Sequence, residues 1–345
     1  MTEQELMILE NMMNRIEQCE KTNAMLMDSV KQLVKSVNVL DETIRVNEQC
    51  FKDFATNNVY EILDNRIQRE ELFFPIVKSV EDTIHEIVDN RKSMSRFGDG
   101  EFSCIDGTLR CKYNATFYAD LADRLKEVLV SDLDNHIVAI ADNYGNVEKY
   151  TDQARREIRN YMTPKTRKMH YELLRHDKTY YNAYVSRFYV IYQEDDEATR
   201  KRFADLKRIW DKRDLIIVEG QYTKMGAGND LFDNAASVKR VLAPAVDAYG
   251  RYDEILDAAM REGNDDSLYL IALGAAACVM AYDIAKLGRQ ALDIGQVDVE
   301  YEWYKMGTTL RVPIKGKYVN EAIGGENVEE VYDAKYESEI AARIY

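Results

Sequence analysis

The sequence lacks several features that would place the protein in a familiar class. Its five cysteines are odd in number and form no C-x-x-C pair, so neither a disulfide framework nor a zinc site is expected. It also lacks the glycine patterns G-x-G-x-x-G and G-x-x-x-x-G-K-[ST], which argues against dinucleotide oxidoreductases and P-loop enzymes. Such a chain suits a reducing compartment.

Long apolar runs and an excess of positive charge are missing as well. No apolar run reaches the ~20 residues of a membrane span, and the opening residues MTEQELMILENMM carry acids where a signal peptide carries Lys or Arg. We therefore expect a cytoplasmic protein. Lys and Arg number 46 against 61 Asp and Glu, a net charge of -15, which argues against a nucleic acid as the main ligand.

The first part of the chain has a heptad repeat. From Leu9 to Ile44 apolar residues recur at alternating steps of three and four, with a break at Asn23. This is the a/d seam of a coiled coil, and Asn at a single a position favours a parallel two-stranded coil. We expect a coiled coil over residues 1–55 and a homodimer through residues 9–47. The alternative is a helix that packs on its own domain or joins a larger bundle.

Residues 56–345 are predicted to form one α/β domain, because extended segments alternate with helical ones in the pattern of a mainly parallel, doubly wound sheet. The expected strands are 93–97, 137–141, 182–188, 215–218, 238–242, 268–273 and 291–294. The expected helices include 77–89, 252–261 and 275–287. Several strands end in Gly or a carboxylate, and in a parallel sheet such ends converge on one ligand site.

The motif R-F-G-D-G-E follows the first of these strands. In an extended backbone Asp99 and Glu101 would point to the same side, with no side chain at Gly100 between them. Two hard oxygen donors so placed suit Mg²⁺ or Mn²⁺, with other coordination positions open to water and a diphosphate. The alternative is an acid pair without function, since such pairs are frequent in an acidic protein.

A second motif, V-E-G-Q-Y-T-K-M-G-A-G-N-D-L-F, joins a strand end to a loop with glycines and a lysine. Glycines let backbone N–H groups approach a phosphate, and nearby cations add positive charge. The candidate phosphate-binding residues here are Lys224, Gly226, Gly228, Asn229 and Arg240. The Asn-Asp step is also expected to cap a helix through residues 233–236. The alternative is a polar surface loop.

The third motif is D-I-G-Q-V-D-V-E-Y-E-W. If this segment is extended, Asp298, Glu300 and Glu302 share one face of a strand. Three acids on one face repel one another, so they form either an exposed edge or a catalytic or metal-linked cluster. The residues alone leave both alternatives open.

Together the motifs resemble those of the GT-D-fold glycosyltransferases, a bacterial family first catalogued as a domain of unknown function. R-F-G-D-G-E, G-x-G-N-D-L-F-D-N-A, L-G-x-x-A and D-I-G-x-x-D-x-E-Y-E-W occur in this order between residues 79 and 303. The resemblance implies a single Rossmann-like domain, a nucleoside-diphosphate sugar donor, typically UDP-glucose, and a metal bound by Asp99 and Glu101. Family members usually have the motif D-I-G-H, and this chain has Gln296 in place of the His. Any function of that His is therefore absent here or performed by another residue.

The expected activity is metal-dependent transfer of a hexose to a glycan or glycoconjugate acceptor. Arg96, Gly98 and Gln296 are further expected donor-binding residues, and Glu300 or Asp298 is the expected base for the acceptor hydroxyl. Two other classes remain. One is a non-catalytic nucleotide-sugar-binding module on a coiled-coil scaffold, which Gln296 favours, and the other is a different metal-dependent enzyme that acts on nucleotides.

Overall fold

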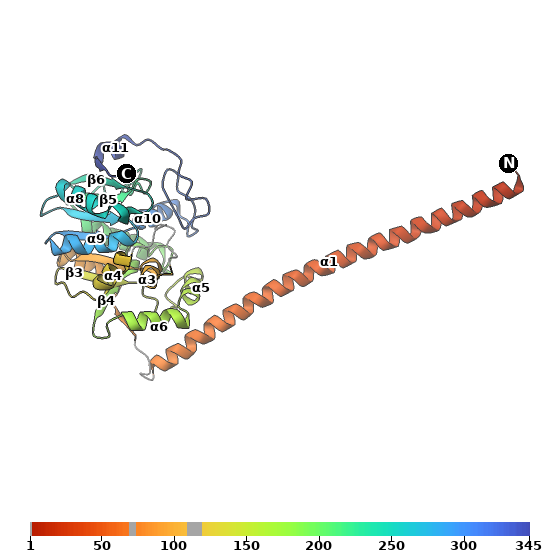
Figure 1. Ribbon diagram of the computed structural model, residues 1–345, viewed down its shortest axis with the longest axis horizontal. Coiled ribbons are helices and arrows are strands. Elements are labelled where there is room, and N and C mark those ends of the chain that lie inside the picture. The colour runs from red at the N-terminus through yellow and green to blue at the C-terminus, as the bar shows by residue number, and fades with distance from the viewer. Residues whose placement is uncertain (1, 69–73, 109–118) are drawn as a thin grey trace. The chain divides into compact units, whose positions relative to one another are not determined.

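The structure, a computed structural model, describes residues 2–68, 74–108 and 119–345. The chain divides into two units, Met1–Ile62 and Leu63–Tyr345. The first unit is helical, and the second is an α/β domain (Figure 1). Cys111, one of the five cysteines, lies outside the described residues.

The long helix α1 spans Glu3–Gln68 and therefore continues past residue 55. Its sequence has no Gly or Pro, and pairs such as Lys21–Glu17, 2.9 Å apart, add support along its surface. The heptad side chains are exposed, from 53% for Leu9 to 64% for Leu33. The helix thus presents an apolar stripe along the predicted seam.

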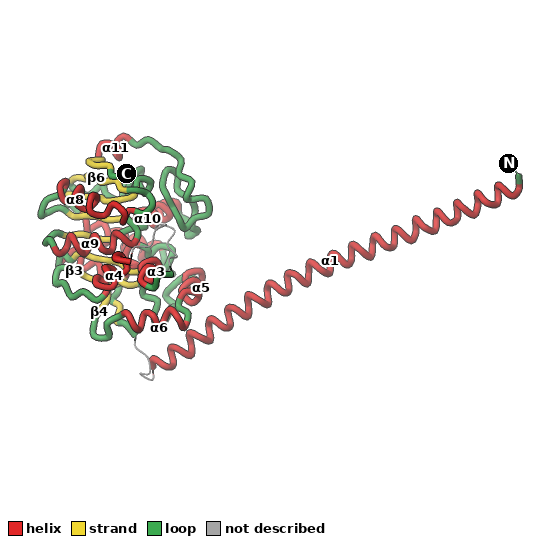
Figure 2. Tube along the Cα trace, viewed as in Figure 1, coloured by secondary structure: helices red, strands yellow, loops and turns green. Residues whose placement is uncertain are grey.

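The second unit alternates strands and helices, as Figure 2 shows. Its strands are β1 Ile76–Val77, β2 Ser93–Phe97, β3 His136–Ile140, β4 Thr179–Asn182, β5 Asp214–Gly220, β6 Ser237–Ala243, β7 Leu268–Ala272, β8 Gln290–Asp293 and β9 Ile340–Arg343. Its α-helices are α2 Val80–Asp89, α3 Asp99–Ile105, α4 Ala119–Leu129, α5 Asp152–Tyr161, α6 Pro164–Leu173, α7 Asp196–Lys207, α8 Tyr252–Glu262, α9 Ala275–Lys286, α10 Val297–Met306 and α11 Ala334–Glu339. Short 3₁₀ helices span η1 Ala183–Ser186, η2 Arg208–Trp210 and η3 Ala248–Arg251.

In the described residues these strands form one sheet in the order β1-β4-β3-β2-β8-β7-β5-β6-β9, and each neighbouring pair is parallel. From β2 the chain proceeds outward to β3 and β4, whereas β8 next to β2 is reached from the opposite side through β7. The strand order therefore reverses between β2 and β8. In open parallel sheets, ligands bind outside the carboxyl ends of the strands at such a switch point.

The core lies on both faces of the sheet, as the alternation along β5 shows. Ile216 and Val218 belong to the apolar cluster that includes α4, α8 and α9, which lie over one face in Figure 1. Leu215 and Ile217 belong to the cluster on the other face, with side chains of α2, α7 and α10. This confirms the predicted doubly wound α/β architecture.

Two of the expected elements are wrong in type or extent. The strand predicted over 182–188 ends at Asn182, because the Asn182 carboxamide accepts a hydrogen bond from Tyr184 N (3.0 Å) and turns the chain into η1. The expected helix over 233–236 does not form. Those residues are in turns that lead directly into β6.

The third motif is also not a strand, since residues 297–306 form α10. Alternating apolar and acidic residues suit a half-buried strand, but here both kinds are buried along the first turns of the helix: Val297, Asp298, Val299, Glu300 and Tyr301. In a helix Asp298 and Glu302 lie one turn apart on one side, and Glu300 points elsewhere. The three acids therefore have different surroundings.

Candidate functional site

The first carboxylate pair lies where β2 ends. Gly98 caps α3, and Asp99 and Glu101 occupy its first turn, so the D-G-E step is helical and the two side chains do not share one side as they would in an extended backbone. The Glu101 carboxylate accepts a hydrogen bond from Gly98 N at 2.8 Å, which draws it back over the helix start. Asp99 is exposed and Glu101 is half-buried. Burial, with the charge of Asp293, raises the pKa of Glu101 to about 7.

Arg96 joins the two strands at the switch point. From β2 it reaches Asp293 at the end of β8, with Nη2 2.6 Å from Oδ1 and Nε 2.7 Å from the main-chain oxygen. Its Nη1 donates to Ser186 Oγ at 2.6 Å. A Cβ at Gly295 would lie 3.3 Å from Arg96 Nη2, so this glycine leaves room for the guanidinium. Arg96 therefore fixes the strand ends beside α3.

On α10, Asp298 and Glu302 both pair with one lysine that the motifs do not predict. Lys317 Nζ lies 2.7 Å from Asp298 Oδ2 and 2.8 Å from Glu302 Oε1, and it is buried. The carboxamide of Asn229 donates to the same two carboxylates, each at 2.7 Å. No motif signals Lys317, because it comes from the irregular segment after α10, fifteen residues beyond Glu302.

Glu300 has a different environment. It is only 1% exposed, its Oε2 accepts a hydrogen bond from Val190 N at 3.1 Å, and its Oε1 has no hydrogen-bond partner among the described residues. Burial raises the pKa of Glu300 to about 7, although Arg187 and the Val190 N–H act in the opposite direction. A carboxyl with this pKa can exchange a proton near neutral pH.

The loop after β5 is held by a buried carboxylate. Glu219 accepts a hydrogen bond from Met225 N at 2.6 Å, which turns the chain back at the strand end. Gly226 and Gly228 have φ values of +77° and +76°, a region that favours glycine. A Cβ at Gly226 would also lie 2.4 Å from Cδ2 of Phe232. The glycines are therefore explained by the fold of the loop itself.

Two cations predicted for phosphate binding have partners within the protein. Arg240 is 2% exposed and pairs with Glu219 and Glu339, each at 2.8 Å. Its predicted contact with phosphate is therefore wrong, because the guanidinium is enclosed under the loop. Lys224 is half-buried, and its Nζ donates to Val331 O at 2.9 Å.

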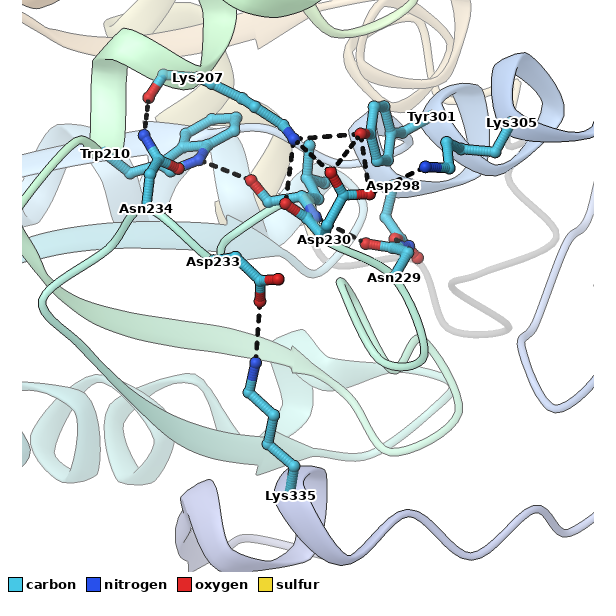
Figure 3. A network of polar contacts seen from close by, with 11 residues as sticks. Lys207, Trp210, Asn229, Asp230, Asp233, Asn234, Asp298, Tyr301, Lys305 and Lys335 are labelled. Atoms are coloured by element: carbon cyan, nitrogen blue, oxygen red, sulfur yellow. Dashed lines mark hydrogen bonds and ion pairs between the residues drawn. The ribbon is translucent and has the colours of Figure 1, made fainter.

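Figure 3 shows how the same loop reaches α10. Asp230 accepts hydrogen bonds from Lys207 Nζ and Tyr301 Oη, each at 3.0 Å, and from Lys305 Nζ at 3.2 Å. Burial alone would raise the pKa of Asp230, but the bonds from Lys207, Lys305 and Tyr301 lower it well below its usual range. Asp230 is thus a permanent anion that ties the loop to α10, with Asn229 beside it (Figure 3).

Gln296 occupies the residue just before α10. Its φ is +73°, in the left-handed region, and its Nε2 donates to Asn320 Oδ1 at 3.2 Å. The side chain therefore joins α10 to the segment that also supplies Lys317. An amide makes this contact without exchanging a proton.

The resemblance to the family implies a metal ion held by the carboxylates of α3. In the described part of the chain no group of three or more His, Cys, Asp or Glu side chains is arranged to hold a metal ion. Asp99 and Glu101 supply two hard oxygen donors, and the charges of Asp293 and Asp99 help to raise the pKa of Glu101. A nearby cation would relieve that repulsion. Residues two apart in a helix point in different directions, so the two side chains do not form a ready-made chelate. Mg²⁺ keeps several waters, takes phosphate oxygens as ligands and needs only one or two such carboxylates from the protein.

Comparison with known proteins identifies the class. The model of the family described as "Glycosyltransferase GT-D fold" matches residues 94–322. A structure described as "A New Glycosyltransferase (DUF1792) from Streptococcus sanguinis" is 32% identical with a TM-score of 0.73, covering 79% of this chain and 100% of that chain. Another, "The highly conserved domain of unknown function 1792 has a distinct glycosyltransferase fold", is 32% identical with a TM-score of 0.72, covering 79% and 96%.

Two curated proteins are also similar. "Glycosyltransferase GlyD" of Streptococcus pneumoniae is 32% identical over 78% of this chain and 32% of its own length. "Probable glycosyl transferase Gly" of Streptococcus gordonii is 31% identical over 90% of this chain and 45% of its own length. The chain thus spans less than half of either relative. It belongs to the GT-D-fold glycosyltransferase family, as its motifs predict. No described helix has both the length and the apolar character needed to cross a membrane.

Proposed function

We propose that this protein transfers a hexose, which we take to be glucose, from a UDP-linked sugar donor to a glycan or glycoconjugate acceptor. The reaction would use a divalent metal ion. The observation that carries the proposal is the pair Asp99 and Glu101 at the switch point of a parallel sheet, in a chain of the GT-D family. Family membership supports sugar transfer. The motif resemblance supports UDP-glucose as the donor.

In the proposed reaction the acceptor hydroxyl oxygen attacks the anomeric carbon, and the bond from that carbon to the diphosphate oxygen breaks. Mn²⁺ or Mg²⁺ held by Asp99 and Glu101 would supply positive charge to the departing diphosphate. We expect the main-chain N–H groups at Gly226 and Gly228, which the positive φ values of this loop leave in a tight turn, to donate to the donor phosphates. Arg96 keeps the strand ends in place through Asp293.

Glu300 is our choice of base, and not Asp298. Both oxygens of Asp298 accept hydrogen bonds, from Asn229 and Lys317, so its negative charge is already compensated. Glu300 has an oxygen without a partner among the described residues and a pKa near 7. It would take the proton of the acceptor hydroxyl as the new glycosidic bond forms. Because Glu300 is buried, the acceptor must displace the side chains that cover it.

Incubation with Mn²⁺ and a panel of nucleotide sugars, with release of free nucleotide as the readout, tests this function. We expect nucleotide release from UDP-glucose that depends on metal and rises when an acceptor is added. Tight UDP binding without turnover of any donor would instead indicate a nucleotide-sugar-binding module. Hydrolysis of nucleotides that carry no sugar would indicate a different metal-dependent enzyme.

We further propose that α1 forms a parallel two-stranded coiled coil and makes the protein a homodimer. The exposed stripe from Leu9 to Ile44 supports this, because an isolated helix in water has nothing to bury such a stripe against. Deletion of residues 1–50 is expected to give a monomer by light scattering that still turns over the donor. A truncated protein that remains dimeric would place the interface in the α/β domain.

A further inference from the structure

The segment that begins at the last residue of η1 is attached to three parts of the site. Ser186 Oγ accepts a hydrogen bond from Arg96 Nη1 at 2.6 Å and donates to Gly295 O at 3.1 Å. Four residues later, Val190 N donates to Glu300 Oε2 at 3.1 Å. Residues 186–190 therefore run from the switch point to the candidate base, and Arg187 lies within this stretch.

The Arg187 guanidinium is only partly satisfied by the protein. Its Nη2 lies 2.6 Å from Glu321 Oε2, while its Nε is buried without a hydrogen-bond partner in the described residues. The side chain as a whole is 28% exposed. An arginine has five N–H donors in a planar fork, which matches the oxygens of a phosphate.

The carboxylates that raise the pKa of Arg187 include the candidate base and a candidate metal ligand. Burial would lower the pKa of Arg187, but Glu321, Glu300 and Asp99 raise it above its usual value. Arg187 is thus a permanent cation whose field extends to both the candidate base and a candidate metal ligand.

Three other cations near the site already pair with carboxylates, whereas Lys224 donates to the main-chain oxygen of Val331. Arg96 is bound to Asp293 and Ser186, Arg240 is enclosed with its two carboxylates, and Lys317 is buried between Asp298 and Glu302. Arg187 combines partial exposure, an Nε without a hydrogen-bond partner among residues 2–68, 74–108 and 119–345, and proximity to the reacting groups.

We propose that Arg187 binds the diphosphate of the donor and stabilises it as it leaves. This rests on the proposed function. As the bond between the anomeric carbon and the diphosphate oxygen breaks, the electron pair goes to that oxygen, and the Arg187 N–H groups donate to the diphosphate. The acceptor proton goes to Glu300. Glu321 is a positioning residue that holds the guanidinium at the edge of the site.

The test compares Arg187→Gln with Arg311→Gln. Arg311 is a matched control because its Nε also approaches Glu321 Oε2, at 3.4 Å, while its Nη2 pairs with Glu157 at 2.7 Å. Calorimetry with UDP and Mn²⁺ measures binding, and nucleotide release from UDP-glucose measures turnover. We expect Arg187→Gln to weaken UDP binding about tenfold or more and to reduce turnover about 10²- to 10³-fold. Arg311→Gln should stay close to the wild type.

Arg187→Lys provides a second variant if Arg187→Gln unfolds. It keeps the charge but loses the fork, so its UDP affinity should lie between those of the wild type and the Gln variant. Equal UDP affinity in Arg187→Gln, Arg311→Gln and the wild type would overturn the proposal. A wild type that binds UDP but turns over no sugar donor would overturn the proposed enzyme, whereas loss of UDP binding in Arg187→Gln would still support the Arg187 contact.

Discussion

The two acidic segments of the site, the start of α3 and the first turns of α10, look alike in sequence but differ in charge balance. In α3, neither Asp99 nor Glu101 forms an ion pair with any described residue. In α10, Asp298 and Glu302 share the buried ammonium of Lys317. Acids that the protein leaves unpaired at the switch point can receive a cation, whereas those that it pairs hold the fold together.

Glu300 belongs to neither group. It lies between two paired acids in the chain, yet it faces Arg187, Glu321 and the main chain near Val190 instead of Lys317. Helical geometry separates it from its neighbours, because residues two apart in a helix point in different directions. We therefore propose metal binding for α3, structural support for two acids of α10, and proton transfer for the third.

The largest expected effect comes from removing the α3 carboxylates. Asp99→Ala and Glu101→Ala should each reduce metal-stimulated donor turnover by about 10³-fold or more, since each loses a proposed ligand of the metal that stabilises the leaving group. Asp106→Ala, at the other end of the same helix, is the control and should remain active. Unchanged dependence on Mn²⁺ in both α3 variants would contradict the metal assignment.

Glu300→Gln should reduce turnover by about 10²- to 10⁴-fold, because the amide cannot accept the acceptor proton. In the wild type the base must be deprotonated, so turnover should rise with pH through about 7, the pKa of Glu300. The measurement is kcat against pH at saturating donor and metal. Turnover in Glu300→Gln that equals the wild type would show that this carboxyl is only structural.

Lys317→Met should destabilise the domain by about 3–5 kcal/mol, since it leaves the buried carboxylate of Asp298 and the half-buried carboxylate of Glu302 without their cation. Urea denaturation measures the loss, and Lys315→Met is the control, because Lys315 is exposed. Adding Asp298→Asn and Glu302→Gln to Lys317→Met should restore part of the stability by removing the uncompensated charges. A Lys317→Met variant as stable as the control would mean that the two acid segments do not differ in charge balance.

The smallest effect is expected at Gln296. If this residue only joins α10 to Asn320, Gln296→His should leave kcat within about tenfold of the wild type. If acid-base chemistry is needed at this position, His should instead raise turnover by about 10²-fold. Steady-state kinetics of the variant beside Glu300→Gln distinguish the two cases.

The sequence predicted the architecture well, because strand and helix periodicity and the motif order depend on local patterns. It also located the acids at strand ends, since β2 and β8 end where predicted or within one residue. The α10 segment shows where local pattern fails: V-D-V-E-Y-E-W alternates like a strand, but it forms a helix in which residues 297–301 are all buried. Lys317 and Arg187 could not be predicted, because their roles depend on tertiary contacts with acids far away in the chain.

The proposal that α3 binds the metal and α10 supplies the base is tested most directly by the affinity for Mn²⁺ in the presence of UDP. The affinity is measured for Glu101→Gln and Glu300→Gln. Glu101→Gln keeps an oxygen for the Gly98 N–H and removes only the charge, so the helix start should persist. We expect Mn²⁺ binding to weaken about tenfold or more in Glu101→Gln and to stay at the wild-type level in Glu300→Gln. Equal weakening in both variants, or unchanged affinity in Glu101→Gln, would contradict this account.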